Sequence, residues 1–493
     1  MADLVRLPGS ERQAVPGAQV LGDVPEEDTV EATVVLNGPS GSVAEESAID
    51  IVRSWAEQAG LQVTSVDPPA RSLTVSGDAR TVQAAFGTRL ALASVGGRRF
   101  RQRTGRIGLP SPVAKVVSAV LGLDDRPQVR PHIRTWQLTQ TGDTPLTPAA
   151  VADAYGFPPR PSAHRVAILE FGGGYSESDT TRTFQLLARP APTVNVISVG
   201  QAPTMSGQDL DSDTEVMLDI GCVAGVAELQ DVDVIFAPPT TQGYYQALAR
   251  ALHGSVAYSA LLITWGNSES AWPAQAMSSL DALLTDAQLK GVLVCVSCGD
   301  AGSANGVADG KPHVDFPASS PHVLAVGGTH LTLGSPGPSS EVVWNDSRGA
   351  TGGGISTVFA RPDWQPGVVP LADGFAGRGV PDVAAPASPG YTVVVHGMKG
   401  SFGGTSAAAP VLLSLVLTAA DDGQPLEGFP GRLYAAGATA LHEIIDGSND
   451  VSGLGVYAAG PGWNACCGLG RPDGDAFARL LRQVSAPQHT ELS

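Results

Sequence analysis

A serine in a glycine-rich turn is the residue of this chain best placed to do chemistry. Ser406 lies in the run Gly403–Pro410, GGTSAAAP, and an apolar, helix-like stretch follows it. A hydroxyl at such a point lies near the unpaired N–H groups and the positive end of the helix. That suits a nucleophile whose attack generates an oxyanion. No histidine motif accompanies the run, so another group must activate Ser406 if it is a nucleophile.

Two carboxylates, Glu215 and Asp219, stand four residues apart at the start of a predicted helix over 215–227. Residues at this spacing share one face of a helix. An acidic pair of this kind is commonly a solvated face, but here apolar residues surround it and predict a buried helix. Buried like charges raise each other's pKa and seldom occur without a purpose. The pair is therefore a candidate base.

Other polar or aromatic side chains follow predicted buried strands. Asp300 comes directly after strand 291–298, Glu170 ends strand 166–170, and Trp265 follows strand 260–264. Asp300 could also simply begin a turn, and Trp265 alone would fit a core residue. Functional groups of parallel sheets gather beyond the carboxyl ends of the strands, where these three lie.

The elements that must position these residues alternate between strand and helix. Such alternation predicts an α/β fold, a mostly parallel sheet with helices on both faces. The predicted strands cover 166–170, 193–199, 233–237, 260–264, 291–298, 323–326 and 391–395, and the helices 215–227, 243–251, 274–290 and 407–420.

The N-terminal quarter is predicted as a separate, small α+β unit of ferredoxin-like type over 29–122. A flexible arm, 1–28, precedes it, and an exposed linker, 123–147, follows. The unit's predicted strands cover 29–36, 61–66, 72–76, 89–94 and 98–101, and its helices 44–59, 79–86 and 113–121.

Composition narrows the function further. The chain has 493 residues and a net charge of −18, which disfavours nucleic acid or an anionic membrane as a partner. No run approaches the roughly 18 apolar residues of a membrane span. The start lacks the plan of a secretory signal. The odd, sparse cysteines, among them Cys295 and Cys298 in a predicted strand, are expected to be buried and structural.

These motifs together resemble the sedolisins, the serine-carboxyl peptidases, and most of all their kumamolisin branch. The motifs, in chain order, are Glu215-x-x-x-Asp219-Ile, Thr264-Trp-Gly, Gly299-Asp-x-Gly, Val314-Asp-Phe-Pro-Ala, Val343-Trp-Asn, Gly352-Gly-Gly, Gly379-Val-Pro-Asp-Val and Gly403–Pro410. The resemblance implies a subtilisin-like fold over 148–493. It also implies that the N-terminal unit is an activation prodomain, acting as an intramolecular inhibitor.

The resemblance also assigns roles. It makes Ser406 the nucleophile, Glu215 the general base, Asp219 its partner and Asp300 a protonated donor to the oxyanion. Glu170 and Trp265 extend this network. The implied enzyme is a monomeric, self-processing endopeptidase that cleaves peptide or protein substrates through an acyl-enzyme in acid. Its carboxylate base and protonated aspartate both favour low pH.

A metal site of the family is only partly matched. The resemblance implies one calcium ion near the C-terminus, and the matching residues are Glu443, Ile444, Gly460, Gly462 and Asn464. The family has aspartate where this chain has Glu443 and Asn464, so one formal charge is lost. Calcium accepts such oxygens, but a loop held by hydrogen bonds, with Asp446 or Asp450 nearby, is the alternative.

Substrate and processing are less determined. The resemblance puts Gly266 and Asp315 in the substrate cleft, where Asp315 would favour a basic side chain. Processing is expected near 137–144. Alternatives are a peptidase dedicated to one cellular target and a catalytically silent binding module. Location is open between extracellular, by family resemblance, and cytoplasmic. A true subtilisin is disfavoured, because neither His253 nor His396 precedes a buried helix of the required kind.

Overall fold

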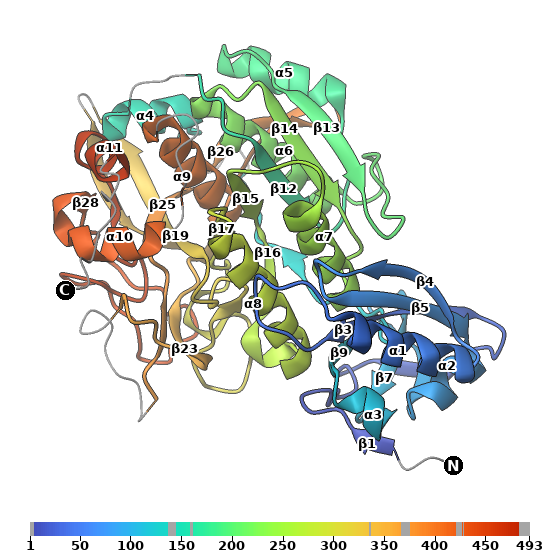
Figure 1. The fold of residues 1–493 in the computed structure, drawn as a ribbon. Coiled ribbons are helices and arrows are strands. Elements are labelled where there is room, and N and C mark those ends of the chain that lie inside the picture. The colour runs from blue at the N-terminus through green and yellow to red at the C-terminus, as the bar shows by residue number, and fades with distance from the viewer. Residues whose placement is uncertain are drawn as a thin grey trace, which may run out of the picture.

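A mostly parallel sheet lies at the centre of the larger part of the molecule (Figure 1). The computed structural model describes residues 4–136, 144–157, 161–334, 337–365, 375–420, 426 and 428–482. Every pair in the sheet is parallel except β19–β20. In spatial order the strands are β13 (Thr193–Ser198), β14 (Asp231–Phe236), β12 (Val166–Glu170), β15 (Ala260–Ile263), β17 (Leu293–Ser297), β19 (Leu324–Leu333) and β20 (Pro338–Val343), with β25 (Val383–Ser388) also paired to β19.

Helices cover both faces of this sheet. Val166 and Ile168 of β12 belong to one core, with α6 (Leu210–Ala227) and α9 (Thr405–Ala419). Ala167 and Leu169 belong to a second core, with α7 (Thr241–His253) and α8 (Ala274–Leu289). Alternate residues of one strand thus face opposite helical layers. This confirms the predicted α/β architecture. The first face also carries α4 (Pro148–Tyr155), α5 (Glu177–Leu187) and α11 (Gly474–Arg482).

The N-terminal unit has its own antiparallel sheet, in the order β4-β5-β3-β9. That order is the ferredoxin-like one. Its elements are β3 (Thr29–Leu36), α1 (Glu46–Gln58), β4 (Gln62–Asp67), β5 (Ser72–Asp78), α2 (Ala79–Ala85), α3 (Ser111–Ala114) and β9 (Val117–Leu121). A smaller sheet joins β2 (Gln19–Asp23), β6 (Arg89–Val95) and β7 (Arg98–Thr104), and β1 (Leu4–Arg6) pairs with β8 (Gly108–Pro110).

Two sequence-based expectations fail in this unit. The helix predicted over 113–121 is only the short α3, followed by strand β9. Val120 pairs with Val34 of β3, and the ladder that completes the sheet outweighs local helix preference. The predicted flexible arm contributes β1 and β2. Leu7 and Val24 anchor it, because both bury their side chains in the unit's core.

The N-terminal unit packs on α7 and α8 of the larger part (Figure 1). Val35 and Ala119 of the unit share a core with Tyr245 of α7. The side chain of Gln275, on α8, bonds both to the backbone N–H of Val120, at 3.3 Å, and to its carbonyl oxygen, at 3.0 Å. The unit is therefore docked through apolar burial and specific polar contacts.

Short strands form several small sheets apart from the central one. Tyr391–Val395 is a strand, as predicted, but it belongs to a separate antiparallel sheet. Within the described residues, no helix is long and apolar enough to span a membrane. The remaining elements are β10 (Arg130–Pro131), β11 (Arg134–Trp136), β16 (Trp265–Ser268), β18 (Asp315–Phe316), β21 (Asn345–Asp346), β22 (Gly349–Ala350), β23 (Gly354–Ala360), β24 (Gly377–Val380), β26 (Tyr391–Val395), β27 (Met398–Gly403), α10 (Phe429–Ala436), β28 (Leu441–His442) and β29 (Arg471–Pro472).

Candidate active site

The turn between β27 and α9 places Ser406 among the other predicted site residues. Gly404, in this turn, has a φ of +98°, which favours glycine. A Cβ atom there would collide with Oδ2 of Asp300 and lie 2.7 Å from the carbonyl oxygen of His132. Glycine therefore lets the chain pass close to both groups. Helix α9 begins one residue later, and Ser406 is fully buried in its first turn.

The hydroxyl of Ser406 donates a hydrogen bond to Oε1 of Glu215. Glu215 lies on α6, which packs against α9 on the same face of the sheet. Both side chains are fully buried. The structure thus brings together the serine and the carboxylate that the sequence predicts as nucleophile and base.

Two further carboxyl groups complete what we call the carboxyl cluster: Glu170, Glu215 and Asp219. Asp219 accepts a hydrogen bond from Oγ1 of Thr264 at 2.8 Å. Glu170, at the end of β12, accepts one from Nε1 of Trp265 at 2.7 Å. All three carboxyl groups are fully buried.

Burial raises the pKa of every member of the carboxyl cluster. It raises the pKa of Glu215 to about 8. The pKa values of Asp219 and Glu170 lie well above their ordinary values, through burial first and then through the negative charge of Glu215. One oxygen of each group has no hydrogen-bond partner among the described residues. The cluster is thus able to hold and exchange protons next to Ser406.

Asp300 follows β17 and faces the start of α9. Its Oδ1 accepts hydrogen bonds from the backbone N–H and from Oγ1 of Thr405, both at 2.8 Å. Its Oδ2 has no hydrogen-bond partner among the described residues, and Nε of Arg134 lies 3.9 Å away. Burial raises the pKa of Asp300, although the charges of Arg134 and His132 partly oppose this. The unpartnered Oδ2 can thus carry a proton to donate.

A stretch of the predicted linker, residues 130–136, crosses the site; we call it the cleft segment. Its β10 pairs antiparallel with β16, and its β11 pairs antiparallel with β27. Between them, the N–H of His132 donates to the carbonyl oxygen of Thr264 at 3.2 Å. The carbonyl oxygen of His132 accepts a hydrogen bond from the backbone N–H of Ser406 at 3.1 Å. The peptide bond between His132 and Ile133 therefore lies at the serine.

The side chain of His132 is buried among polar groups of the site. Its Nδ1 lies 2.9 Å from Oγ of Ser297, and its Nε2 lies 3.3 Å from Oδ2 of Asp315. Although burial alone would lower it, the carboxylate of Asp315 raises the pKa of His132 above the ordinary value. A Cβ atom at Gly266 would collide with Asp315 and meet the His132 ring at 3.0 Å. The structure thus places both predicted cleft residues around this imidazole.

Sequence reasoning missed several residues of this site. Thr264 and Thr405 stand inside the quoted motifs, and their adjacency to Trp265 and Ser406 was the available signal. His132 lies in the predicted linker, where no neighbouring motif indicates chemistry. The only local signal is Pro131, which favours an extended conformation in the residue before it. The predicted processing stretch, 137–144, lies outside the described residues except for Thr144.

The residues predicted to bind calcium lie together, yet they bond to one another. Oε1 of Glu443 accepts a hydrogen bond from the N–H of Gly462 at 2.8 Å. Nδ2 of Asn464 donates to the carbonyl oxygens of Ile444, at 3.1 Å, and Gly460, at 3.2 Å. A donor group aimed at two carbonyls does not fit a cation at that point.

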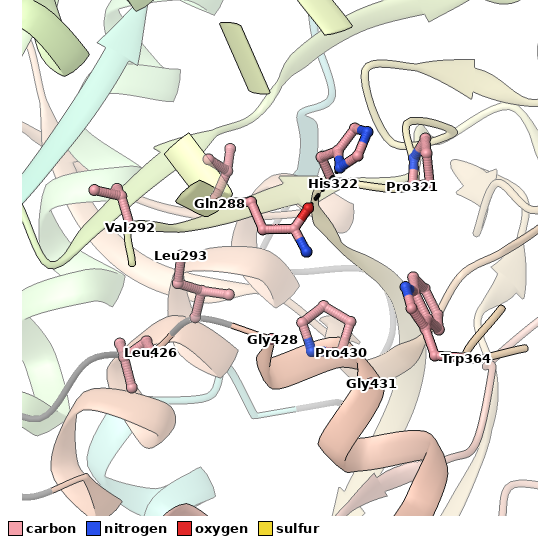
Figure 2. A pocket seen from close by; sticks show the side chains of 11 residues that line it. Gln288, Val292, Leu293, Pro321, His322, Trp364, Leu426, Gly428, Pro430 and Gly431 are labelled. Carbon is pink, nitrogen blue, oxygen red and sulfur yellow. Dashed lines mark hydrogen bonds between the residues drawn. The ribbon is translucent and has the colours of Figure 1, made fainter. Parts of the chain in front are cut away.

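A separate pocket lies far from this chemistry. Figure 2 shows that its wall contains His322, Trp364 and Pro430. Nδ1 of His322 lies 2.6 Å from Oε1 of Gln288. None of the predicted catalytic residues lines this pocket, so we assign it no part in the reaction.

Comparisons with known proteins agree with the site. Residues 42–126 match the family described as pro-kumamolisin, activation domain. Kumamolisin of Bacillus sp. (strain MN-32) is 37% identical over 88% of this chain and 82% of the relative. Sedolisin of Pseudomonas sp. (strain 101) is 28% identical over 89% of this chain and 79% of the relative. Tripeptidyl-peptidase sed5 of Aspergillus fumigatus is 28% identical over 90% and 86%, respectively.

A solved structure shares the fold. It is described as Pseudomonas sedolisin (serine-carboxyl proteinase) complexed with two molecules of pseudo-iodotyrostatin. Its TM-score is 0.61 at 27% sequence identity, and the match covers 69% of this chain and 99% of that chain. The central sheet and its helices are thus those of a known peptidase fold.

Proposed function

We propose a function from one premise: this chain belongs to the sedolisin family of serine-carboxyl peptidases and is a kumamolisin-like precursor that retains its activation domain. We propose that it is an endopeptidase, active in acid, that cuts its own cleft segment to mature. The observation that carries this proposal is the position of the His132 carbonyl, bonded to the N–H of Ser406 beside the bond from Ser406 to Glu215.

The reaction uses Ser406 as nucleophile. Its Oγ attacks the carbonyl carbon while its proton passes to Glu215, and the carbonyl oxygen becomes an oxyanion. The backbone N–H of Ser406 and the protonated Oδ2 of Asp300 donate to that oxyanion. Glu215 then gives the proton to the leaving nitrogen, the C–N bond breaks, and an acyl-enzyme remains. Water releases the acyl group in the same way, with Glu215 again taking and returning the proton.

Asp219 and Glu170 act on the base rather than on the substrate. The burial of three carboxyl groups makes a second full charge in the cluster costly. A single negative charge can therefore be shared, and Asp219 helps to hold Glu215 in the form that accepts a proton. A hydrogen bond from Thr264 holds Oδ2 of Asp219 in place, and one from Trp265 holds Oε2 of Glu170.

Acid dependence follows from Asp300. Its Oδ2 can donate only while protonated, so activity should fall as pH rises through its raised pKa. The base needs a negative charge at the same time. Burial is the first cause of the high pKa of Glu215, so water entering the cleft after maturation lowers that pKa. The active state thus combines an ionised cluster with a protonated Asp300.

The cleft segment supports cleavage within a chain rather than near its end. Residues continue on both sides of His132, and on the N-terminal side Nδ2 of Asn267 donates to the carbonyl oxygen of Gln128 at 2.8 Å. Gln128 is the fifth residue before that bond, so the site contacts residues beyond the three that a peptidase limited to terminal tripeptides would need. The pairing of His132 with Asp315 supports a basic side chain, such as histidine, before the scissile bond.

Self-processing is tested with the full-length precursor, incubated from pH 3 to 8 and followed by intact mass. We expect a first cut between His132 and Ile133 in acid, and no cut in a Ser406→Ala variant. A library of peptides with blocked N-termini then separates the modes of cleavage, because a tripeptidyl-peptidase leaves them intact and an endopeptidase cleaves them. A first cut elsewhere would contradict the assignment of His132.

The same experiment addresses the rival functions. A catalytically silent binding module would leave both precursor and library uncut and would not react with a peptide aldehyde that captures serine. A peptidase dedicated to one target would cut itself but almost none of the library. Broad cleavage after basic residues is the expected result.

A further inference from the structure

The buried amide of Asn464 makes four hydrogen bonds to the backbone of the loop region at Glu443–Cys467. Oδ1 of Asn464 accepts hydrogen bonds from the backbone N–H groups of Cys466, at 3.1 Å, and Cys467, at 3.0 Å. Its Nδ2 donates to the carbonyl oxygens of Ile444 and Gly460. Asn464 is 8% exposed, so these four bonds replace most of its contact with water.

Its partners fix which way the amide points. A flipped amide would set Oδ1 against two carbonyl oxygens and Nδ2 against two N–H donors, and all four bonds would be lost. The N–H group therefore stands where the Ile444 and Gly460 carbonyls converge. A calcium ion prefers six to eight oxygen ligands at about 2.3–2.6 Å. Here the Nδ2 donor of Asn464 occupies the point at which the carbonyl oxygens of Ile444 and Gly460 converge.

Neighbouring carboxylates are also committed to this loop region. Glu443 accepts the N–H of Gly462. Asp450 accepts the N–H groups of Leu454, at 2.9 Å, and Gly455, at 2.6 Å, and the hydroxyl of Ser303 at 3.0 Å. Within the described part of the chain, no three His, Cys, Asp or Glu side chains are grouped to hold a metal.

We propose that the amide of Asn464 takes the place of the calcium ion implied by the family resemblance, so that the chain folds and keeps its site without calcium. The same loop region bears on the site, because the carbonyl oxygen of Asn449 accepts the N–H of Ser303 at 3.0 Å, in the turn after Asp300. Ile444, Cys466 and Cys467 of this region share an apolar cluster with Val343 and Ala384.

The test measures thermal unfolding of the full-length precursor in chelator and in calcium, on a Ser406→Ala background that prevents self-cleavage. The unfolding temperature should be the same in both, since a ligand raises it only by binding the folded state. Asn464→Asp removes the donor and sets a carboxylate against two carbonyls. We expect this variant to unfold at a lower temperature in chelator, and its unfolding temperature to rise progressively as calcium is added.

Asn345→Asp is the matched control. Nδ2 of Asn345, an exposed residue, donates to one carbonyl oxygen, that of Ser448, at 2.7 Å. It should lose some stability without responding to calcium. Two results with the parent protein would overturn the proposal. One is saturable calcium binding in titration calorimetry after chelator treatment, and the other is an unfolding temperature that rises with calcium. A calcium-insensitive Asn464→Asp variant also overturns it. These readouts need no peptidase activity, so they stand apart from the proposed function.

Discussion

At the scale of single residues, this site depends on carboxyl groups that are buried in different ways. The charge of Glu215 acts on Glu170 and Asp219, whereas the charges of Arg134 and His132 act on Asp300. Each of these groups has one oxygen without a hydrogen-bond partner among the described residues, but only in the first setting can a proton be shared between neighbouring carboxyl groups. Two carboxyl groups on either side of Ser406 can therefore take opposite roles, one as base and one as acid.

Replacing Asp300 tests the acid role. Asp300→Ala removes a donor to the oxyanion and should lower kcat by about 10²–10³-fold. Asp300→Asn keeps the acceptor for Thr405 and supplies a donor that does not titrate. We expect this variant to lose much of the decline in kcat/KM between acid and neutral pH. The pH profiles of both variants on one blocked peptide provide the measurement.

The motif residues could be predicted from the sequence because each has a distinctive neighbourhood. Ser406 follows glycines, and Glu215 and Asp219 interrupt an apolar helix. His132 could not, because its importance comes from contacts with Ser297 and Asp315, which lie far along the chain. Asn464 was recognised, but its effect on a cation depends on the direction of its amide, which a sequence does not give.

At the scale of secondary-structure elements, the site forms where the carboxyl ends of strands lie close to the N-terminal ends of helices. The parallel strands could be predicted from apolar runs, since a buried strand such as β17 has no polar face. The failure at 113–121 has the opposite cause: the local pattern was compatible with a helix, and pairing with β3 decided the outcome. The antiparallel placement of Tyr391–Val395 was likewise decided by its partner, β27.

The turn before α9 gives a prediction at this scale. Gly404→Ala introduces a Cβ atom into the space of Asp300 and His132 at a positive φ. The turn must shift, and Ser406 moves with it. A displacement of roughly 1 Å at a catalytic group can reduce the rate by about 10²-fold. We expect a loss of that order in kcat, with the protein still folded by circular dichroism.

A second glycine, Gly310, allows the effect of backbone strain to be measured apart from that of steric crowding. Gly310 has a φ of +75°, and no atom of the described residues lies within 4 Å of a Cβ atom placed there. Gly310→Ala should cost about 1–2 kcal/mol in unfolding free energy through the left-handed conformation alone, and it should leave kcat unchanged. Equal losses of kcat in both variants would show that the close approach at Gly404 is unimportant.

At the scale of the whole molecule, the N-terminal unit and the cleft segment act together to close the site. The unit sits on α7 and α8, and the cleft segment continues from it across Ser406. Cutting the segment need not release the unit, because its own contacts remain. One of them is a buried ion pair, NH2 of Arg71 to Oδ2 of Asp286 on α8, at 3.0 Å.

Asp286 links docking to pH. Its Oδ1 also accepts the N–H of Gly41 at 2.6 Å, and Nε2 of His253 lies 3.5 Å from Oδ2. Although burial alone would raise it, these neighbours together with Arg71 lower the pKa of Asp286 below 3.8. The ionised carboxylate thus strengthens docking above that pH. Its contribution is lost as pH falls through the lowered pKa, so only strong acid loosens this contact.

Asp286→Asn should therefore release the unit under milder conditions. The variant leaves Arg71 buried without its counter-charge, and breaking a buried pair in this way costs about 3–5 kcal/mol. We expect the cleaved unit to separate from the larger part at a higher pH than in the parent, measured by size-exclusion chromatography after self-cleavage. Arg98→Ala, which removes an exposed pair with Asp209, is the control and should change little. Retention of the unit by Asp286→Asn down to the same pH as the parent would show that the apolar interface alone holds it.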